Sequence, residues 1–259
     1  METGAFTSYF DVAQIAIWGF WLFFAGLIFY LRSEDKREGY PLISDAKRRV
    51  LVQGFPPIPS PKTFLLDGGE KVLSPRAEPP EVVNLRATAN WPGAPYAPTG
   101  NPMLDGVGPA AYSRIRADHP DHSLDDNQPK IVPLRTLPDF FLATEDPDPR
   151  GMEVIGADGV AVGTAMDVWI DRSETVVRFI EVELAQPIGS GRILLPFHYA
   201  QIRSSKGQLR VGSITGAQFA DVPRLREPET VTCLEEDKLM AYFAGGLLYA
   251  TPARLGPLL

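Results

Sequence analysis

The sequence predicts one N-terminal transmembrane α-helix followed by a mainly-β cytoplasmic domain, a small antiparallel barrel, with a C-terminal α-helix. Three observations support this fold class: an apolar run without a charge, short alternating segments separated by turn residues, and a late apolar stripe at helical spacing. We expect five parts, namely a periplasmic N-terminus at 1–11, a transmembrane helix at 12–31, an extended proline-rich cytoplasmic segment at 32–150, the barrel with its closing helix at 151–250, and a tail at 251–259.

The apolar run at residues 12–31 has the length of a membrane span. As a helix its 20 residues extend about 30 Å, which matches the hydrocarbon thickness of a bilayer. Trp18 and Trp21 lie inside the run, and Tyr30 lies near its end, where aromatic side chains favour the headgroup level. Residues 1–11 contain no Lys or Arg, so the basic start of a cleaved signal peptide is missing. We therefore expect a retained anchor.

Basic residues follow the run, and none precedes it. Arg32, Lys36 and Arg37 come directly after it, and residues 47–49 add three more. The positive-inside rule predicts an N-terminus outside the cytoplasm and a cytoplasmic location for residues 32–259. Arg32, Lys36 and Arg37 are also candidates for contacts with phospholipid headgroups, and a solvated flank is an equally good interpretation.

The segment at 32–150 is rich in proline, with 18 of the 25 prolines between Pro56 and Pro149. Because proline removes a backbone donor and fixes φ, this density excludes a long helix or a central strand. Aromatic residues are nevertheless scattered through the segment, which is not typical of a disordered linker. We expect an extended segment ordered by lying on partner subunits, with short strands at 63–66 and 82–85.

From about Met152 the pattern is that of short strands. Residues 160–171 and 176–184 alternate in polarity. Three further strands are expected at 192–195, 199–203 and 209–214.

A helix is expected to close the domain. Thr232 and Glu235 have the spacing of a capping box, and apolar residues then recur at helical spacing. Gly245 and Gly246 either allow close packing of this helix or end it.

The composition excludes several classes of function. The net charge of −7 and the pI of about 5.1 argue against a nucleic-acid partner. Serine-hydrolase, P-loop, dinucleotide-binding and zinc-protease motifs are missing, so we expect neither an enzyme nor a resident metal. The single cysteine, Cys233, excludes an internal disulfide, and we interpret it as a small buried hydrophobe rather than a reactive thiol.

Two histidines lie in an acidic, proline-containing stretch. His119 and His122 are close to Asp125 and Asp126. Imidazole and carboxylate exchange protons readily near neutral pH, so this stretch either gathers protons or is simply a polar loop.

A second group of ionisable residues lies on the strands expected at 160–171 and 176–184 and on the turn between them. It contains Asp171, Glu174 and Arg178, together with Glu181 and Glu183. Such residues either form a buried hydrogen-bonded chain with shifted pKa values or line the solvated face of an antiparallel sheet.

Four motifs, in order, resemble the H subunit of purple-bacterial photosynthetic reaction centres. They are REGYPL at 37–42, APTGNPMLDGVGPA at 97–110, FIEVEL at 179–184 and VTCLEEDKLMAYFAGGLLYA at 231–250. The region from about 152 to 214 resembles the PRC-barrel, a small β-barrel named after this subunit.

The resemblance implies a structural and proton-conducting subunit. It would cap the pigment-bearing L and M subunits, stabilise the quinone sites and help deliver protons to the secondary quinone. The partners would carry the bacteriochlorophyll, bacteriopheophytin, quinones, non-haem iron and carotenoid, none of them bound principally by this chain. Antenna proteins, a cytochrome and membrane phospholipids are further implied partners. Tyr40, Trp18 and Trp21 are expected to contact the partner subunits.

The resemblance also implies roles for individual residues. Asp171 and Glu174 match the family's acids nearest the secondary quinone, and Arg178 belongs to the same cluster, which favours the proton-path interpretation. At the proton entrance the family has two histidines, where this chain reads Asp125-Asp126-Asn127-Gln128. His119 and His122, slightly upstream, either substitute for them or leave the entrance elsewhere.

Two other functions remain compatible with the residues. A membrane-tethered PRC-barrel adaptor would recruit another cytoplasmic partner and leave quinone chemistry unchanged. A tethered enzyme would need a nucleophile–base pair or a metal site, which the sequence does not offer.

Overall fold

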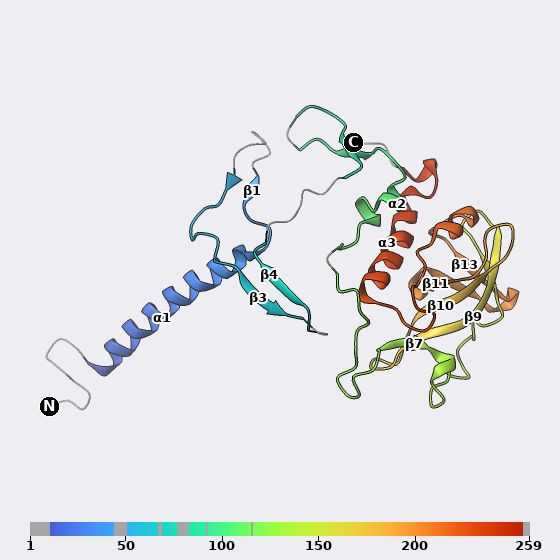
Figure 1. Cartoon of the computed structure of the whole chain (residues 1–259), viewed down its shortest axis with the longest axis horizontal. Coiled ribbons are helices and arrows are strands. Elements are labelled where there is room, and N and C mark those ends of the chain that lie inside the picture. Colours follow the sequence, from blue (N-terminus) through green and yellow to red (C-terminus); the bar gives the residue numbers. More distant parts are fainter. Residues whose placement is uncertain are drawn as a thin grey trace. The chain divides into compact units, whose positions relative to one another are not determined.

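The computed structural model describes residues 11–43, 51–66, 69–76, 83–91, 93–114 and 116–255. They form two compact units, one within residues 1–81 and 91–93, and the other within 82–90 and 94–259. The first unit holds the apolar helix, and the second holds the main sheet and the closing helix (Figure 1).

The apolar run forms α1, Val12–Glu34, as the sequence predicts. Asp11 caps its N-terminus, because its Oδ1 accepts a hydrogen bond from the Gln14 amide at 2.7 Å. Its described side chains are not buried within the chain. Of the described helices it is the one long and apolar enough to cross a membrane.

The remainder of the first unit consists of short elements: η1 (Asp35–Arg37), β1 (Leu42–Ile43), β2 (Leu51–Val52), β3 (Lys62–Leu65) and β4 (Lys71–Ser74). β1 pairs with β2 and β3 pairs with β4, both antiparallel. The guanidinium group of Arg37 joins this unit together, since Nη1 donates to the carbonyls of Ser60 at 2.7 Å and Ser74 at 2.9 Å. The same group binds the Glu34 carboxylate at 2.7 Å through Nε.

The second unit begins with further short elements: β5 (Leu85–Ala87), β6 (Tyr96–Pro98), α2 (Pro102–Asp105), η3 (Gly108–Ala110), β7 (Ile131–Pro133) and η4 (Leu134–Thr136). The proline-rich segment therefore holds more local structure than expected. Several of its prolines lie at positions where a missing backbone N–H disrupts no regular hydrogen bonding, for example at the first turn of α2 and at the end of β6. The strand expected at 82–85 instead occupies Leu85–Ala87, in register with β6, and Val82 is outside the described residues.

A seven-stranded sheet forms the centre of the second unit. Its order is β11-β10-β9-β8-β13-β12, with β7 paired to β9. Its strands are β8 (Glu153–Ile155), β9 (Ala161–Asp171), β10 (Val176–Leu184), β11 (Arg192–Pro196), β12 (Ala200–Arg203) and β13 (Gln208–Val211), in addition to β7. All pairings are antiparallel except β13 with β8. The two end strands of this order, β11 and β12, are consecutive in the chain and are joined by η5 (Phe197–Tyr199).

The strong alternation expected along β9 holds only in its first half. Asp167 to Asp171 are all buried, because η4 and β7 cover this end of the strand. Trp169 and Phe179 are among the largest fully buried side chains of the core. Of the two alternatives for this ionisable group, a solvated face is therefore excluded for Asp171 and Glu181, which are 7% and 2% exposed.

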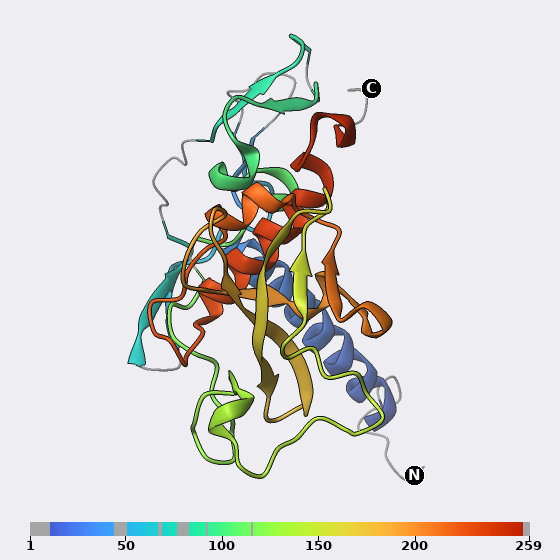
Figure 2. The same cartoon turned by 90° about the vertical axis from the view of Figure 1, so that its right-hand side faces the viewer.

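The closing helix is α3, Cys233–Tyr249, and it packs beside the sheet (Figures 1 and 2). Thr232 and Glu235 form the predicted capping box. Gly245 and Gly246 lie inside the helix and allow close packing. A Cβ on Gly246 would collide with the carbonyl of Ser213, and one on Gly245 would collide with Ala110. The remaining short helices are η6 (Ser204–Lys206), η7 (Gly216–Asp221) and η8 (Pro252–Arg254).

Candidate functional site

A polar pocket of about 160 Å³ lies where the β9–β10 turn meets the start of α3. Three segments far apart in the sequence supply its walls. Its lining residues are Arg116, Asp121, Lys130, Ile131, Asp171, Glu174, Arg178, Val231, Thr232, Cys233 and Glu236. The structure thus brings together the three strand and turn residues that the sequence singled out, Asp171, Glu174 and Arg178.

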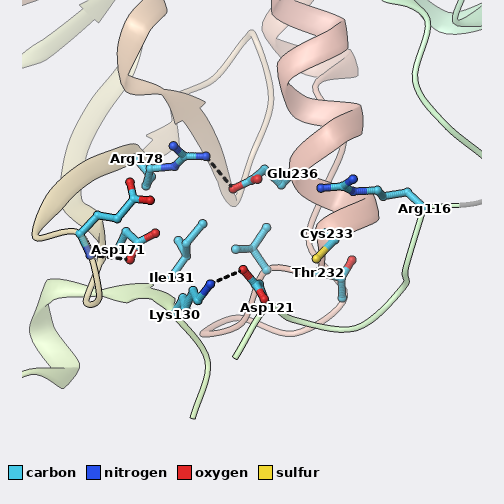
Figure 3. Close-up of a pocket in the computed structure, with 11 residues that line it drawn as sticks. Arg116, Asp121, Lys130, Ile131, Asp171, Arg178, Thr232, Cys233 and Glu236 are labelled. Carbon is cyan, nitrogen blue, oxygen red and sulfur yellow. Dashed lines mark hydrogen bonds and ion pairs between the residues drawn. The ribbon is translucent and has the colours of Figure 1, made fainter. Parts of the chain in front are cut away.

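Ion pairs cross this pocket at two places (Figure 3). Lys130 Nζ binds Asp121 Oδ2 at 2.8 Å, and the Asp121 carboxylate raises the pKa of Lys130. Arg178 Nη2 lies 3.5 Å from Glu236 Oε2, which connects β10 with the first turn of α3. The positive charges needed to stabilise carboxylates are therefore built into the pocket wall.

Asp171 and Glu174 are held by the turn between β9 and β10. Asp171 Oδ1 accepts hydrogen bonds from the amides of Ser173 at 2.9 Å and Glu174 at 3.1 Å. Thr175 has a positive φ of 54°, which completes the tight reversal. The carboxylate of Asp171 is thereby fixed while Glu174 stays exposed at the rim.

The acidic loop that was a candidate for proton gathering docks next to this pocket. Arg172 forms a two-pronged ion pair with Asp126, at 2.8 and 3.0 Å, and its Nε donates to the Pro129 carbonyl. The Arg172 guanidinium lowers the pKa of Asp126. Asp125 is exposed, and its amide donates to Ser123 Oγ at 3.3 Å. The loop is thus positioned by Asp126 and leaves Asp125 facing solvent.

The two histidines of the loop lie near each other. The rings of His119 and His122 are stacked with centroids 6.4 Å apart. His119 Nδ1 is 2.9 Å from the Pro120 carbonyl oxygen. The backbone carbonyl of His119 accepts a hydrogen bond from the amide of the pocket residue Cys233 at 3.0 Å. His119 therefore contacts the segment that lines the pocket.

A second ionic network surrounds Glu181 on β10. Glu181 accepts hydrogen bonds from Arg135 Nη1 at 2.7 Å, Arg192 Nη1 at 2.7 Å and Trp169 Nε1 at 3.0 Å. Burial alone would raise the pKa of Glu181, but the bonds from Arg135 and Trp169 and the nearby positive charges lower it below its ordinary value. Glu181 and its neighbour Glu183 are therefore structural ion-pair residues, separate from the pocket of Asp171.

The residues expected to contact lipid headgroups divide into two groups. Arg32 is exposed, with 63% of its side chain accessible, and it keeps that role as a prediction. Lys36 and Arg37 are buried and donate to carbonyls of this same chain, so their charged groups point into the first unit. This burial was invisible in the sequence, because the accepting carbonyls come from residues 53–74.

The three residues expected to contact partner subunits differ in exposure. Trp18 and Trp21 are exposed on α1. Tyr40 is half-buried, with its ring 5.3 Å from Lys36 Nζ.

Metal ligation finds no support in the described part of the chain, where no three His, Cys, Asp or Glu side chains are grouped to hold an ion.

Two family comparisons now bear on this architecture. Residues 4–136, just over half of the chain, match the model of the photosynthetic reaction centre H-chain N-terminal region. Residues 144–218 match the PRC-barrel domain. The chain belongs to the reaction centre H-chain family. It is a subunit of a photosynthetic reaction centre, non-pigment-binding and non-enzymatic as that family is, and it associates with the L and M subunits. Its single apolar helix fits a single-pass protein of the photosynthetic membrane.

Several pocket residues of this H chain were not singled out from the sequence. They are Arg116, Asp121, Lys130 and Glu236. The β-bridge between His122 and Pro129 brings Asp121 and Lys130 together, and this pairing is visible only in the structure. Arg116 and Glu236 join the pocket only through the docking of α3.

Proposed function

We propose that this H chain caps the cytoplasmic face of the L and M subunits, stabilises the quinone sites and contributes to proton delivery to the secondary quinone. The observation that carries the proposal is the pocket in which Asp171, Glu174 and Arg178 meet. The wider assembly would include antenna proteins, a cytochrome and phospholipids, with the N-terminus periplasmic and most of the chain cytoplasmic.

The chemistry requires such a group of residues. Reduction of a quinone to a quinol consumes two electrons and two protons, and a quinone site shielded from water needs side chains that relay protons. Within the described chain, Asp121 and Glu236 are neutralised by Lys130 and Arg178, whereas the carboxylates of Asp171 and Glu174 form no ion pair. Asp171 and Glu174 are therefore the acids best suited to accept and release a proton.

The residues of the proposed entrance have different roles. Asp126 is held charged by Arg172 and positions the loop. Asp125, which is exposed, and the stacked pair His119 and His122 would collect protons from water. The contact between His119 and the Cys233 amide links this loop to the pocket wall.

The test compares two acids on the same hairpin. Glu174→Gln removes a carboxyl group from the pocket, and Glu183→Gln removes an exposed carboxyl group outside it that pairs with Arg192. We expect second-electron transfer to quinone in the assembled complex to slow several-fold in Glu174→Gln and to stay unchanged in Glu183→Gln. Equal rates in both variants, with an unchanged absorption spectrum, would remove Glu174 from the proposed path.

A further inference from the structure

The loop at residues 53–57 folds back onto the transmembrane helix. The ring of Phe55 lies 5.7 Å from the ring of Phe29, centroid to centroid. Phe29 belongs to the apolar run, two residues before its last member, Leu31. At a rise of about 1.5 Å per residue, Phe29 lies roughly 3 Å inside the end of the span. The tip of this loop is therefore at the depth of the membrane-spanning segment.

A buried lysine holds this loop in place. Lys36 Nζ donates to the carbonyl of Gln53 at 2.7 Å and to the carbonyl of Pro56 at 2.6 Å, the two sides of the Phe55 tip. Gly54 has a φ of +66°, a conformation that glycine adopts without strain and that reverses the chain just before Phe55. The position of Phe55 is thus fixed by α1 and η1, the elements that anchor the chain.

The Phe55 side chain is 82% exposed, although it is large and apolar. Phe29 beside it is also exposed, so the two rings form one apolar surface that continues the exposed apolar surface of α1. Water is an unfavourable neighbour for such a surface, whereas the acyl-chain edge of a bilayer is a favourable one. Arg32, three residues after Phe29, presents its charge at the level expected of headgroups.

We propose that Phe55 is a second membrane anchor, inserted into the boundary between lipid headgroups and acyl chains beside α1. Its partner is the lipid bilayer, because the ring is held against Phe29 near the end of the apolar run, three residues before the exposed Arg32, where acyl chains meet headgroups. Lys36 acts as the positioning residue, through the two carbonyls that flank Phe55. This inference needs only that α1 spans the membrane, and it is independent of the direction of the span and of proton delivery.

The test measures the depth of a spin label at position 55 in the assembled complex in lipid nanodiscs. Phe55→Cys is labelled in a background without reactive native cysteines, in which Cys233 is replaced by serine. Collisions with oxygen, which partitions into the bilayer, are compared with collisions with nickel-EDTA-diacetic acid, which stays in water. Phe141→Cys is the matched control, since Phe141 has nearly the same exposure, 84%, and belongs to the second unit.

We expect the ratio of oxygen to nickel collisions to be several-fold higher at position 55 than at position 141. Adding Lys36→Met should lower the ratio at position 55 and increase the mobility of the label, because the two flanking carbonyls lose their donor. A ratio at position 55 equal to that at position 141 would place the loop in water and overturn the proposal. Protection from both reagents would show that the L or M subunit covers Phe55, which would overturn it as well.

Discussion

Replacing Glu181 with leucine tests whether the ionic network around this carboxylate stabilises the second unit. Glu181 is 2% exposed and accepts hydrogen bonds from Trp169, Arg135 and Arg192. Within the described chain, the substitution removes the acceptor of the Trp169 indole N–H, and Trp169 is fully buried. A buried donor left without a partner costs about 1–3 kcal/mol.

The loss of the Glu181 contacts with Arg135 and Arg192 adds less to the destabilisation. Arg135 keeps its bond to Asp167 and Arg192 keeps its pair with Glu183, and both guanidinium groups are partly exposed. Removing one partner of a buried ion pair costs about 3–5 kcal/mol. Because both arginines are partly exposed and keep a second partner, the cost at Glu181 should lie at the lower end of that range. We expect the free energy of opening of the sheet to fall by about 3 kcal/mol, which corresponds to about 100-fold faster exchange of its protected amides.

Hydrogen exchange of β9 and β10 peptides in the full chain, kept in detergent micelles, measures this change. Glu183→Leu is the control, because Glu183 lies two residues along the same strand and shares Arg192 as a partner. An exposed pair of this kind contributes about 0–1 kcal/mol, so exchange should change less than about fivefold. Similar exchange rates in the two variants would refute the reasoning.

Three further outcomes follow from single contacts. Gly246→Ala should destabilise α3 by about 1–3 kcal/mol, measured by hydrogen exchange, because the new Cβ would collide with Ser213. This cost should exceed the gain from the better helix propensity of alanine. A more stable α3 in the variant would contradict the close packing at Gly246. Thr232→Ala should cost about 1 kcal/mol through the lost cap of α3, and a shift below a few tenths would show that the cap is dispensable. The ion pair with Arg172 lowers the pKa of Asp126 in the folded chain. This ion pair should therefore stabilise the loop fully when the pH is above about 4, the ordinary pKa of an aspartate. The stabilisation should be lost as the pH falls through the lowered pKa. Asp126→Asn should abolish this acid transition in an NMR titration of the loop amides and Asp125→Asn should not; an identical transition in both variants would show another cause.

Much of the fold follows from local patterns in the sequence. The length and lack of charge of the span predict α1, the alternation at Ile180–Leu184 predicts β10, and the Thr232–Glu235 box predicts the start of α3. These signals are local because each depends on residues within one element. The short pairs β1–β2 and β5–β6 were not foreseen, since hydrogen bonding between strands of two or three residues leaves no periodicity.

The candidate site was predicted in its centre and missed at its edges. Asp171 and Arg178 were grouped from their places on the expected strands, and the family resemblance supplied their proposed role. The burial of Asp171 was not evident from alternation, because η4 and β7 cover one end of β9. Glu236 entered the site through the packing of α3 against the turn, a long-range contact that spacing does not encode. Lys36 shows the same limit, since a flank rich in basic residues gave no sign that one of them holds a loop.

Flash-induced proton uptake by the assembled complex tests the central claim most directly. The variants are Asp171→Asn, Glu174→Gln and the double substitution, each compared with the wild type by a pH-indicator dye, with reduction of the primary quinone as an internal control. We expect proton uptake to slow several-fold in each single variant and further in the double variant, while reduction of the primary quinone is unchanged. Wild-type uptake in the double variant would show that protons reach the quinone without this pocket.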